Sequence, residues 1–437
     1  MRGVRPPRRG SVRGGVPWGA LIWHGAATVA APGLRLMLRR RAARGKEVAA
    51  RLAERRGIEA APRPSGRLLW LHAASVGETV SVLPVLGALA ARAPDLHVLF
   101  TTGTVTAAAL LRRRLPELGL RRVLHRFVPL DVPAWAARFL DHWRPDAAAF
   151  VESELWPNLV AACRARGMPM MLVNARLSPR SFAGWRRAPG LARRVLGAFG
   201  RVWAVSEADA GRLRALGARG VEVPGDLKFA APPLPVDEAE LTRLRAALAG
   251  RPVWLAASTH PGEEAAAEEV HRALVPAHPG LLTVVAPRHP ERGAEVAAVL
   301  GGAPRRGAGQ GPGEAGAWVA DTVGELGLLY RLAPVVFVGK SLAGGGGQNP
   351  LEPARLGCAV ACGPHMENFA AAAAVLEGAG ALHRVRDASE LAAWVSAMLR
   401  DPAARAAKGE AARAASGRYA DLPDRTAQAL LGLMERP

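Results

Sequence analysis

Two neighbouring segments, Val335-Val-Phe-Val-Gly339 and Gly344-Gly-Gly-Gly-Gln-Asn-Pro-Leu-Glu-Pro-Ala354, predict the fold of this chain most directly. The apolar run is typical of a strand in a parallel sheet, because such strands are covered on both faces. The glycines allow a tight turn and a close approach of the backbone to a ligand. Pro350 suits the first turn of a following helix, where free N–H groups would face an anion. Glu352 would lie in that turn, within reach of a hydroxyl beside a phosphate.

The glycine run has two interpretations. Glycines alone favour a flexible surface loop, since isolated Gly-rich motifs are weak evidence of a binding site. The ordered Asn-Pro-Leu-Glu-Pro sequence that follows favours a nucleotide-sugar site instead.

Short apolar runs alternate with helical stretches on both sides of a Pro-rich break at 230–236. The expected strands are 68–71, 97–100, 147–151, 170–173, 202–205, 253–257, 282–285, 317–320 and 335–338. This alternation predicts an α/β fold of two doubly wound Rossmann-like domains. Two such halves leave a cleft, and ligands in this architecture bind at the C-terminal ends of the strands. We expect domains at 47–229 and 230–437, after a separate N-terminal segment at 1–46.

The N-terminal segment differs in composition from the rest. Residues 1–15 are basic and rich in Pro and Gly, and we expect them to be disordered. Residues 16–38 are apolar with Trp18 and Trp23, and an arginine cluster follows. A cleaved signal peptide is the alternative, but charge on both flanks disfavours translocation, and the stretch is short for a transmembrane span. We expect a helix that lies in, or shallowly enters, the cytoplasmic face of a membrane, with arginines on lipid phosphates.

Composition limits the function without fixing it. The 437 residues carry a net charge of +21, mostly from arginine, which favours an anionic partner or reflects genome composition. Nucleic acid is not the expected partner, because the aromatics are scarce and scattered. The three cysteines show neither a disulfide framework nor a zinc pattern, and they fit core packing in a reducing compartment.

Acidic residues stand at two strand ends of the first half. The first strand ends in Leu71-His-Ala-Ala-Ser-Val-Gly-Glu78, where the helix dipole favours an ionised Glu78 that can accept a proton. An ordinary capping glutamate is the alternative, and in isolation the better one. Glu152-Ser-Glu-Leu-Trp-Pro-Asn158 follows another buried strand, and local capping accounts for only one of its two carboxylates. Asn174-Ala-Arg-Leu-Ser-Pro-Arg-Ser181 offers cations for a phosphate or a sugar carboxylate, with a solvated basic face as the alternative.

The second half adds polar turns to the same predicted cleft. Gly225-Asp-Leu-Lys228 directs a lysine toward it, and Pro287-Arg-His-Pro-Glu-Arg292 follows a strand. Ala257-Ser-Thr-His-Pro-Gly-Glu-Glu264 can bind phosphate through N–H groups and hydroxyls. His260 is a candidate ligand, although a histidine that stabilises the turn is at least as good an interpretation.

Together these segments resemble the 3-deoxy-D-manno-octulosonic acid (Kdo) transferases of lipid A assembly. The resemblance runs in order from the N-terminal segment to about residue 415, so coincidence is a poor explanation. The matching motifs are His72-Ala-Ala-Ser-Val-Gly-Glu78, Glu152-Ser-Glu-Leu-Trp-Pro-Asn158, Asn174-Ala-Arg-Leu-Ser178, Gly225-Asp-Leu-Lys-Phe229, Ala257-Ser-Thr-His-Pro-Gly-Glu-Glu264, Pro287-Arg-His-Pro-Glu-Arg292, Asp321-Thr-Val-Gly-Glu-Leu326, Gly346-Gly-Gln-Asn-Pro-Leu-Glu-Pro353 and Gly363-Pro-His-Met-Glu-Asn-Phe369.

The resemblance implies a glycosyltransferase B fold, with an acceptor-binding first domain and a second domain that binds the CMP sugar. It implies transfer of Kdo from CMP-Kdo to a phosphorylated lipid A precursor (lipid IVA) at the cytoplasmic face of the inner membrane, in lipopolysaccharide core biosynthesis. Glu78 then resembles the general base, and Glu152 and Lys228 resemble residues that stabilise the transition state. The residues that resemble CMP contacts are Pro287, Arg288, Val323, Gly324, Glu325, Asn349, Pro350, Leu351 and Glu352.

We expect attack opposite the phosphate, which inverts the anomeric carbon, and we expect no cofactor. The chain contains no Asp-x-Asp pair, which fits transfer without a metal ion. Three residues depart from the family pattern: Ser153 replaces a usual Thr, Trp185 a usual Tyr, and Gln348 a frequent His. Two alternatives remain at this point. One is another nucleotide-sugar enzyme of the same fold, a UDP-sugar transferase or an epimerase. The other is a non-enzymatic basic protein that binds lipid or nucleic acid.

Overall fold

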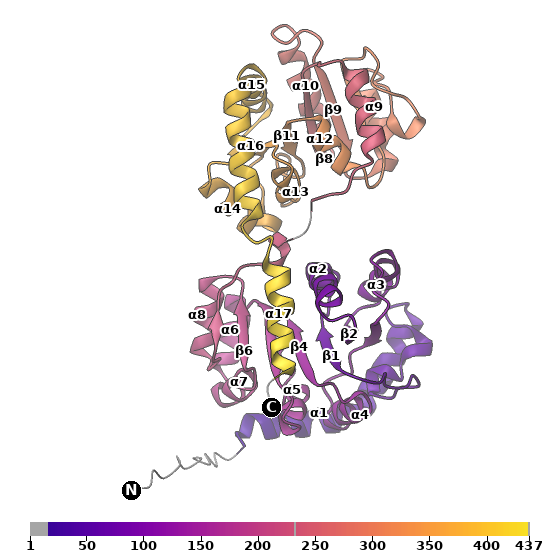
Figure 1. Cartoon of the computed structure of the whole chain (residues 1–437), viewed down its shortest axis with the longest axis vertical. Coiled ribbons are helices and arrows are strands. Elements are labelled where there is room, and N and C mark those ends of the chain that lie inside the picture. Colours follow the sequence, from indigo (N-terminus) through magenta and orange to yellow (C-terminus); the bar gives the residue numbers. More distant parts are fainter. Residues whose placement is uncertain (1–15, 231–232, 436–437) are drawn as a thin grey trace. The chain divides into compact units, whose positions relative to one another are not determined.

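The chain forms two compact units in a computed structural model that describes residues 16–230 and 233–435 (Figure 1). The first unit extends to Lys228 and includes the C-terminal segment from Asp421; the second spans Phe229–Ala420. The N-terminal stretch expected to be disordered, and two residues of the expected linker, lie outside the described residues.

The first unit is built on a parallel seven-stranded sheet in the order β3-β2-β1-β4-β5-β6-β7, within the described part of the chain. Its strands are β1 (Leu68–His72), β2 (His97–Thr102), β3 (Val123–Phe127), β4 (Ala147–Val151), β5 (Met170–Ala175), β6 (Arg201–Ala204) and β7 (Val221–Glu222). Its helices are α1 (Trp18–Ala43), η1 (Ala49–Arg51), η2 (Glu54–Arg56), α2 (Val76–Arg92), α3 (Val105–Glu117), α4 (Pro133–Trp143), α5 (Pro157–Ala165), α6 (Pro179–Arg186), α7 (Pro189–Leu196), α8 (Glu207–Ala215) and α17 (Leu422–Met434).

The second unit contains a parallel six-stranded sheet in the order β10-β9-β8-β11-β12-β13, again counting the described residues. A short helix, η3 (Leu227–Ala230), lies at the boundary of the two units. The strands are β8 (Val253–Thr259), β9 (Leu282–Pro287), β10 (Ala317–Val319), β11 (Val335–Val338), β12 (Ala359–Cys362) and β13 (Leu382–Arg384). The helices are α9 (Glu238–Leu248), α10 (Glu263–Leu274), η4 (Pro290–Arg292), α11 (Gly293–Val299), η5 (Arg306–Ala308), α12 (Leu326–Leu332), α13 (Leu351–Arg355), η6 (Glu367–Phe369), α14 (Ala370–Gly378), α15 (Ala388–Arg400) and α16 (Pro402–Gly417).

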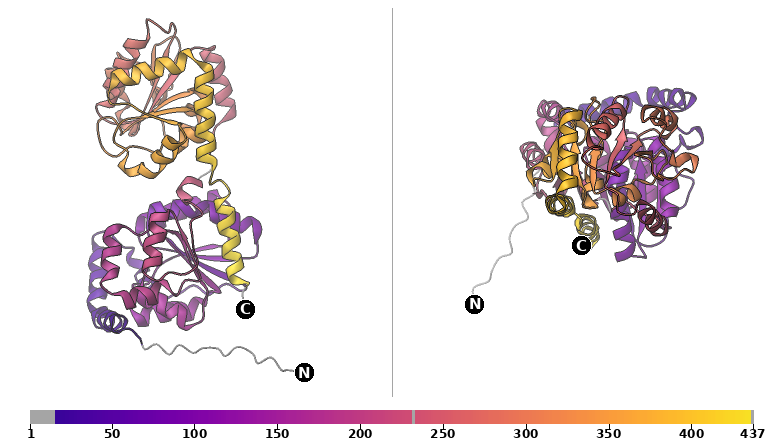
Figure 2. Two further views of the ribbon diagram at one scale, coloured as in Figure 1. Left: turned by 90° about the vertical axis from the view of Figure 1, so that its left-hand side faces the viewer. Right: turned by 90° about the horizontal axis from the view of Figure 1, so that it is seen from above.

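Helices cover both faces of each sheet (Figure 2), so the central strands are apolar along their whole length, as expected for parallel sheets. All five residues of β4 are buried, and so are the four residues of β11. In the first core Trp70 packs against Phe139 and Phe150, with ring centroids 4.9 and 5.0 Å apart. The three cysteines are buried, which confirms the prediction that they pack in the core.

The strand order reverses once in each sheet, and this places the functional loops. β1 lies between β2 and β4, and β8 lies between β9 and β11. At such a switch point the connections leave on opposite faces of the sheet, so a crevice opens beyond the C-terminal ends of the two central strands. The predicted doubly wound folds are confirmed, and all nine expected strands are present.

The expected domain at 230–437 differs from the structure at its end. α17 packs against α2, β4 and β5 and belongs to the first unit. Its buried face includes Ala427, Leu430 and Leu433, and Arg92 forms an ion pair with Asp424 at 3.0 Å. An amphipathic helix read in sequence does not reveal which sheet it covers.

The expected separate segment at 1–46 also differs, because α1 packs on the first unit. Leu38 is 2% exposed and packs with Val132 and Trp135. Trp23 donates from Nε1 to Asp131 at 2.7 Å. None of the described helices is both long and apolar enough to cross a membrane.

Candidate functional site

Glu78 occupies the turn between β1 and α2, at the switch point of the first sheet. Ser75 caps α2, and Glu78 Oε2 accepts the N–H of Ala74 at 2.8 Å while Oε1 accepts the Ser75 hydroxyl at 2.7 Å. Burial raises the pKa of Glu78, and the negative charges of Glu154 and Glu152 raise it further against these hydrogen bonds. Glu78 therefore has the capping role that was the alternative interpretation. The negative charges of Glu154 and Glu152 also act on its carboxyl group.

Glu154 comes from the turn after β4, the strand next to β1. Its Oε2 accepts the Trp156 Nε1–H at 2.7 Å and lies 3.4 Å from Nε2 of His72, a fully buried residue. Burial alone would raise the pKa of Glu154, but the hydrogen bonds from His72 and Trp156, with the charge of His72, lower it. Glu154 is therefore the ionised neighbour of Glu78.

Glu152 holds two cations at the same edge of the sheet. Its Oε1 lies 2.8 Å from Lys228 Nζ and 3.6 Å from Arg176 Nε. The backbone of Glu152 has φ of +59°, a left-handed conformation that a side chain adopts only where the surroundings impose it. Glu152 and Lys228, which were predicted separately, are thus in contact.

Supporting bonds fix the segment that carries Lys228. Arg176 donates to Asp226, which also accepts the Lys228 N–H at 3.0 Å. Asn174, with φ of +54°, accepts the Leu227 N–H at 2.8 Å through its side chain. The loop after β5 therefore sets the position of the lysine.

In the second unit the Asn349–Glu352 turn forms the start of α13. Asn349 accepts the Leu351 N–H at 3.1 Å and donates to Glu352 at 3.1 Å, so one of the N–H groups expected to face an anion is already capped. Pro350 is the residue immediately before the five-residue helix. Burial raises the pKa of Glu352, and the charges of Arg355 and Arg288 oppose that shift. The turn after β9 and the turn after β11, predicted to share one site, therefore lie close together.

The predicted turn Val323-Gly324-Glu325 is exposed at Val323, and the carboxylate of Glu325 is already paired. The Val323 side chain is 86% exposed, and Gly324 has φ of +87°. Glu325 accepts from Arg306 at 2.6 Å and from Thr322, and the bond from Arg306 lowers its pKa.

Glu263 organises the glycine-rich loop. This residue of α10 is 1% exposed, and its two oxygens accept the N–H groups of Lys340, Ser341 and Leu342 at 2.6, 2.9 and 2.9 Å. It also accepts the His260 N–H at 3.0 Å. A buried carboxylate with four N–H donors joins the turn after β8 to the turn after β11.

The loop itself is folded rather than a loose surface connection. Gly347 has φ of +75°, and a Cβ there would meet Met366 Sδ at 2.3 Å. Its N–H donates to Lys340 at 2.7 Å. Gln348 Nε2 lies 3.3 Å from His260 Nε2, so the residue that departs from the family pattern belongs to this cluster.

Sequence reasoning named Glu78, Glu152 and Lys228 individually, and the structure brings them to one edge of the first sheet. It quoted Glu154 and Glu263 only within motifs and assigned them no role. Both follow strands and resemble ordinary capping acids, so nothing in the sequence alone separates them from surface carboxylates.

The chain is similar to known proteins in sequence and in fold. Residues 50–231 match the family described as 3-deoxy-D-manno-octulosonic-acid transferase (kdotransferase). The 3-deoxy-D-manno-octulosonic acid transferase of Bordetella pertussis is 40% identical over 386 residues, covering 85% of this chain and 88% of that protein. A probable mitochondrial 3-deoxy-D-manno-octulosonic acid transferase of Arabidopsis thaliana is 35% identical over 392 residues, covering 85% and 86%. The structure of UDP-GlcNAc 2-epimerase from Neisseria meningitidis aligns with a TM-score of 0.56 at 12% identity, covering 84% of this chain and 99% of that chain, which shows the fold alone.

The two doubly wound sheets have the GT-B fold, and the matching family and relatives identify the chain as a glycosyltransferase. The chain belongs to the 3-deoxy-D-manno-octulosonic acid (Kdo) transferase family.

Proposed function

We propose that this enzyme transfers Kdo from CMP-Kdo to a hydroxyl of a phosphorylated lipid A precursor, lipid IVA. Family membership supports the donor sugar and the reaction class. The observation that carries the proposal is the position of Glu78, a buried carboxyl at the switch point whose pKa is raised by burial and by two neighbouring carboxylates. A base with a raised pKa is better matched to proton transfer near neutral pH.

In the proposed reaction Glu78 accepts the proton of the acceptor hydroxyl as its oxygen bonds to the anomeric carbon of Kdo. The bond between that carbon and the CMP phosphate breaks, and CMP leaves. Attack opposite the phosphate inverts the anomeric configuration. The ion pair of Lys228 and Glu152, 2.8 Å apart, supports this step as a fixed charge arrangement that stabilises the transition state.

In this proposal the second unit binds the CMP group of the donor. Arg288 supplies a cation for the phosphate, and Pro287 precedes it at the end of β9. Glu352 accepts a hydroxyl beside the phosphate, in the turn that Asn349 fixes. The backbone of Val323-Gly324-Glu325 is the third contact, because Glu325's own carboxylate is engaged by Arg306. No metal ion takes part.

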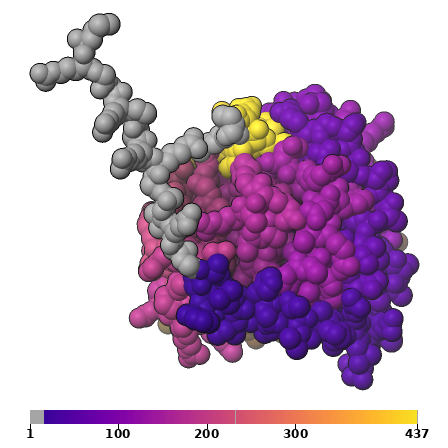
Figure 3. Space-filling model, turned by 90° about the horizontal axis from the view of Figure 1, so that it is seen from below, coloured from indigo at the N-terminus to yellow at the C-terminus, as the bar shows by residue number. Residues whose placement is uncertain are grey.

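The proposed location is the cytoplasmic face of the inner membrane, with α1 on the anionic lipid surface. The exposed side of α1 carries large apolar side chains, with Trp18 81%, Ile22 68% and Val29 82% exposed. Arg35, Arg39 and Arg40 are exposed near its end. Figure 3 shows α1, in dark indigo, lying open along the surface of the first unit. Apolar side chains next to arginines are typical of helices that lie in the interface of anionic membranes.

The test compares the purified wild type with Glu78→Gln in reactions containing CMP-Kdo and lipid IVA. Mass spectrometry of the lipid should show Kdo addition by the wild type, and initial rates should fall by about 10²–10⁴-fold in the variant. CMP affinity, measured by calorimetry, should be unchanged. Undiminished turnover by Glu78→Gln would remove Glu78 as the base. Inhibition of the wild type by UDP but not by CMP would support the alternative, a UDP-sugar enzyme.

A further inference from the structure

A groove of about 960 Å³ opens on the first unit, apart from the site residues described above. Its walls are α3, β3 and the segment 48–61, which connects α1 to β1. Most of its lining is apolar, from Val105 at the start of α3 to Leu115 near its end. With a rise of 1.5 Å per residue, that stretch of α3 is about 15 Å long.

Two large aliphatic side chains of this lining are exposed to water. Val48 is 39% exposed and Ile58 is 41% exposed, although both belong to the wall formed by the connecting segment. Burial of these two side chains against an apolar ligand would be favourable.

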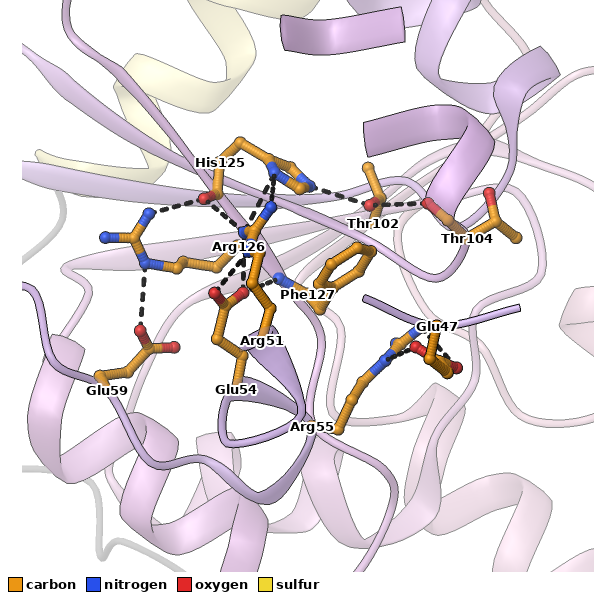
Figure 4. A network of polar contacts seen from close by, with 10 residues as sticks. All are labelled: Glu47, Arg51, Glu54, Arg55, Glu59, Thr102, Thr104, His125, Arg126 and Phe127. Atoms are coloured by element: carbon orange, nitrogen blue, oxygen red, sulfur yellow. Dashed lines mark hydrogen bonds and ion pairs between the residues drawn. The ribbon is translucent and has the colours of Figure 1, made fainter. Parts of the chain in front are cut away.

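Charge pairs lie in the wall formed by β3 and the connecting segment (Figure 4). Arg51 pairs with Glu54 at 2.6 Å, and Arg126 pairs with Glu59 at 3.1 Å. Burial and the nearby arginines lower the pKa of His125 to about 3, so this ring is neutral at physiological pH. The groove is therefore held open by a network with little free charge.

The free charge of the groove is positive and lies on its rim. Arg112 of α3 and Arg121, which precedes β3, line the groove and are exposed. Within residues 16–230 and 233–435 no carboxylate forms an ion pair with either guanidinium. An apolar channel with unpaired arginines at its edge complements an amphiphile that has an anionic head group.

One end of the groove is joined to the loop of Glu78. Val105, a lining residue, is the first residue of α3, and Gly103, two residues before it, donates its N–H to the Ala74 carbonyl at 3.0 Å. Ala74 in turn donates its N–H to Glu78 at 2.8 Å. A chain lying in the groove would thus extend from the neighbourhood of the proposed base.

We propose that this groove binds an acyl chain of the phosphorylated lipid acceptor, with Arg112 and Arg121 facing an acceptor phosphate. The proposal rests on the proposed function and adds to it the part of the acceptor that this surface recognises. An extended acyl chain matches the length of the groove and the apolar side chains that make up most of its lining, so its burial there would be favourable.

The test fills the groove with Ala109→Trp, a substitution at an exposed position of α3 that lines it. Ala215→Trp, at an exposed position at the end of α8 and outside the groove, is the matched control. Rates are measured with CMP-Kdo and either lipid IVA or chemically deacylated lipid IVA. We expect Ala109→Trp to raise the KM for lipid IVA by about 10-fold or more, since loss of apolar burial scales with the area left in water. Its kcat/KM for the deacylated acceptor and its KM for CMP-Kdo should match those of the control.

An unchanged KM for lipid IVA in Ala109→Trp would overturn the groove proposal while leaving the proposed function intact. Equal losses with both acceptors would overturn it as well, because the defect would not concern the acyl chain. Failure of the wild type to transfer Kdo would instead contradict the proposed function. Direct binding of radiolabelled lipid IVA, without turnover, then decides on the groove: retention by the wild type and loss in Ala109→Trp supports it, and equal retention refutes it.

A second pair of measurements addresses the rim. The double variant Arg112→Gln/Arg121→Gln should bind lipid IVA more weakly by about 10-fold, and enzymatically dephosphorylated lipid IVA as the wild type does. If it instead binds both lipids like the wild type, and only its retention on phosphatidylglycerol vesicles falls, the arginines serve bilayer attachment and the acceptor assignment is wrong. A change in oligomeric mass caused by Ala109→Trp would identify a second copy of the chain as the occupant, which also overturns the proposal.

Discussion

Lys228 Nζ lies 2.8 Å from Glu152 Oε1, and this contact joins the loop after β4 to the segment at the boundary of the two units. Glu152 makes this contact with its backbone in a left-handed conformation. Asp226 and Asn174 accept hydrogen bonds from the segment that carries the lysine. A strained residue kept in place by several bonds is typical of a functional site.

The first prediction concerns that ion pair. Lys228→Met and Glu152→Gln should each lower kcat by about 10–10³-fold, because a fixed charge at the transition state is removed. Their effects should not add in the double variant, since each loss already breaks the same pair. The check is a double-mutant cycle on kcat. Additive losses would mean that the two residues act separately.

The second prediction concerns pH. Glu78 must be deprotonated to act as a base, and its pKa is raised by burial, with the charges of Glu154 and Glu152 adding to the shift. Activity should therefore rise with pH through a value above 4.5, the ordinary pKa of a glutamate. Glu154→Gln removes one of these charges, so the acidic limb of kcat/KM should move to lower pH. Glu117→Gln, an exposed acid paired with Arg114 on α3, is the control and should leave the limb in place.

The third prediction concerns Glu263. Glu263→Ala leaves four N–H groups without their acceptor, that of Ser341 buried and the other three partly buried, so thermal stability should fall, by about 1–3 kcal/mol for the buried group alone. CMP affinity should fall by about 10-fold or more, because the glycine-rich loop loses its fixed position. Glu269→Ala, exposed on the same helix, should change neither quantity. Loss of stability with unchanged CMP affinity would make Glu263 purely structural.

The fourth prediction concerns the donor site. Glu352→Ala should weaken CMP binding by about 10-fold with little change in kcat at saturating CMP-Kdo, since the lost contact is made in both the ground and the transition state. Calorimetry and saturation kinetics give the two numbers. Unaltered CMP affinity would argue against the proposed hydroxyl contact.

The fifth prediction concerns α1. Replacing Trp18, Ile22 and Val29 by Ser should reduce co-sedimentation with vesicles that contain phosphatidylglycerol, because these side chains lie on the exposed face of the helix. Activity toward deacylated lipid IVA should be retained, since Leu38 and Trp23 still attach α1 to the first unit. Full vesicle binding by the triple variant would mean that another surface contacts the membrane.

The fold could be predicted from sequence because its central strands are uninterrupted apolar runs. The strands that were not predicted, β3, β7, β12 and β13, lack such a run or lie at the edge of a sheet. β3 contains His125 and Arg126, whose polarity breaks the apolar run, and the structure accommodates them by pairing both with the connecting segment. β12 is a four-residue stretch with little apolar bulk, and β13 and β7 lie at sheet edges.

The site was predictable to the extent that its residues resemble a family motif. Glu78 in isolation is best interpreted as a capping acid, and the structure shows that it is one; its position at a strand end indicated that it could accept a proton, and the resemblance favoured that second role. The capping bonds and the carboxylates of Glu152 and Glu154 depend on side chains brought together by neighbouring strands. The role of Glu263 could not be predicted for the same reason. Its hydrogen-bond donors Lys340, Ser341 and Leu342 lie 77 to 79 residues further along the chain, in the loop after β11.

The return of α17 to the first sheet has a consequence for biosynthesis. Because this helix covers α2, β4 and β5, the first unit stays incomplete on one side until residues 422–434 have left the ribosome. A nascent or prematurely terminated chain would present that bare apolar surface to chaperones and proteases, even though every proposed catalytic group had already been synthesised.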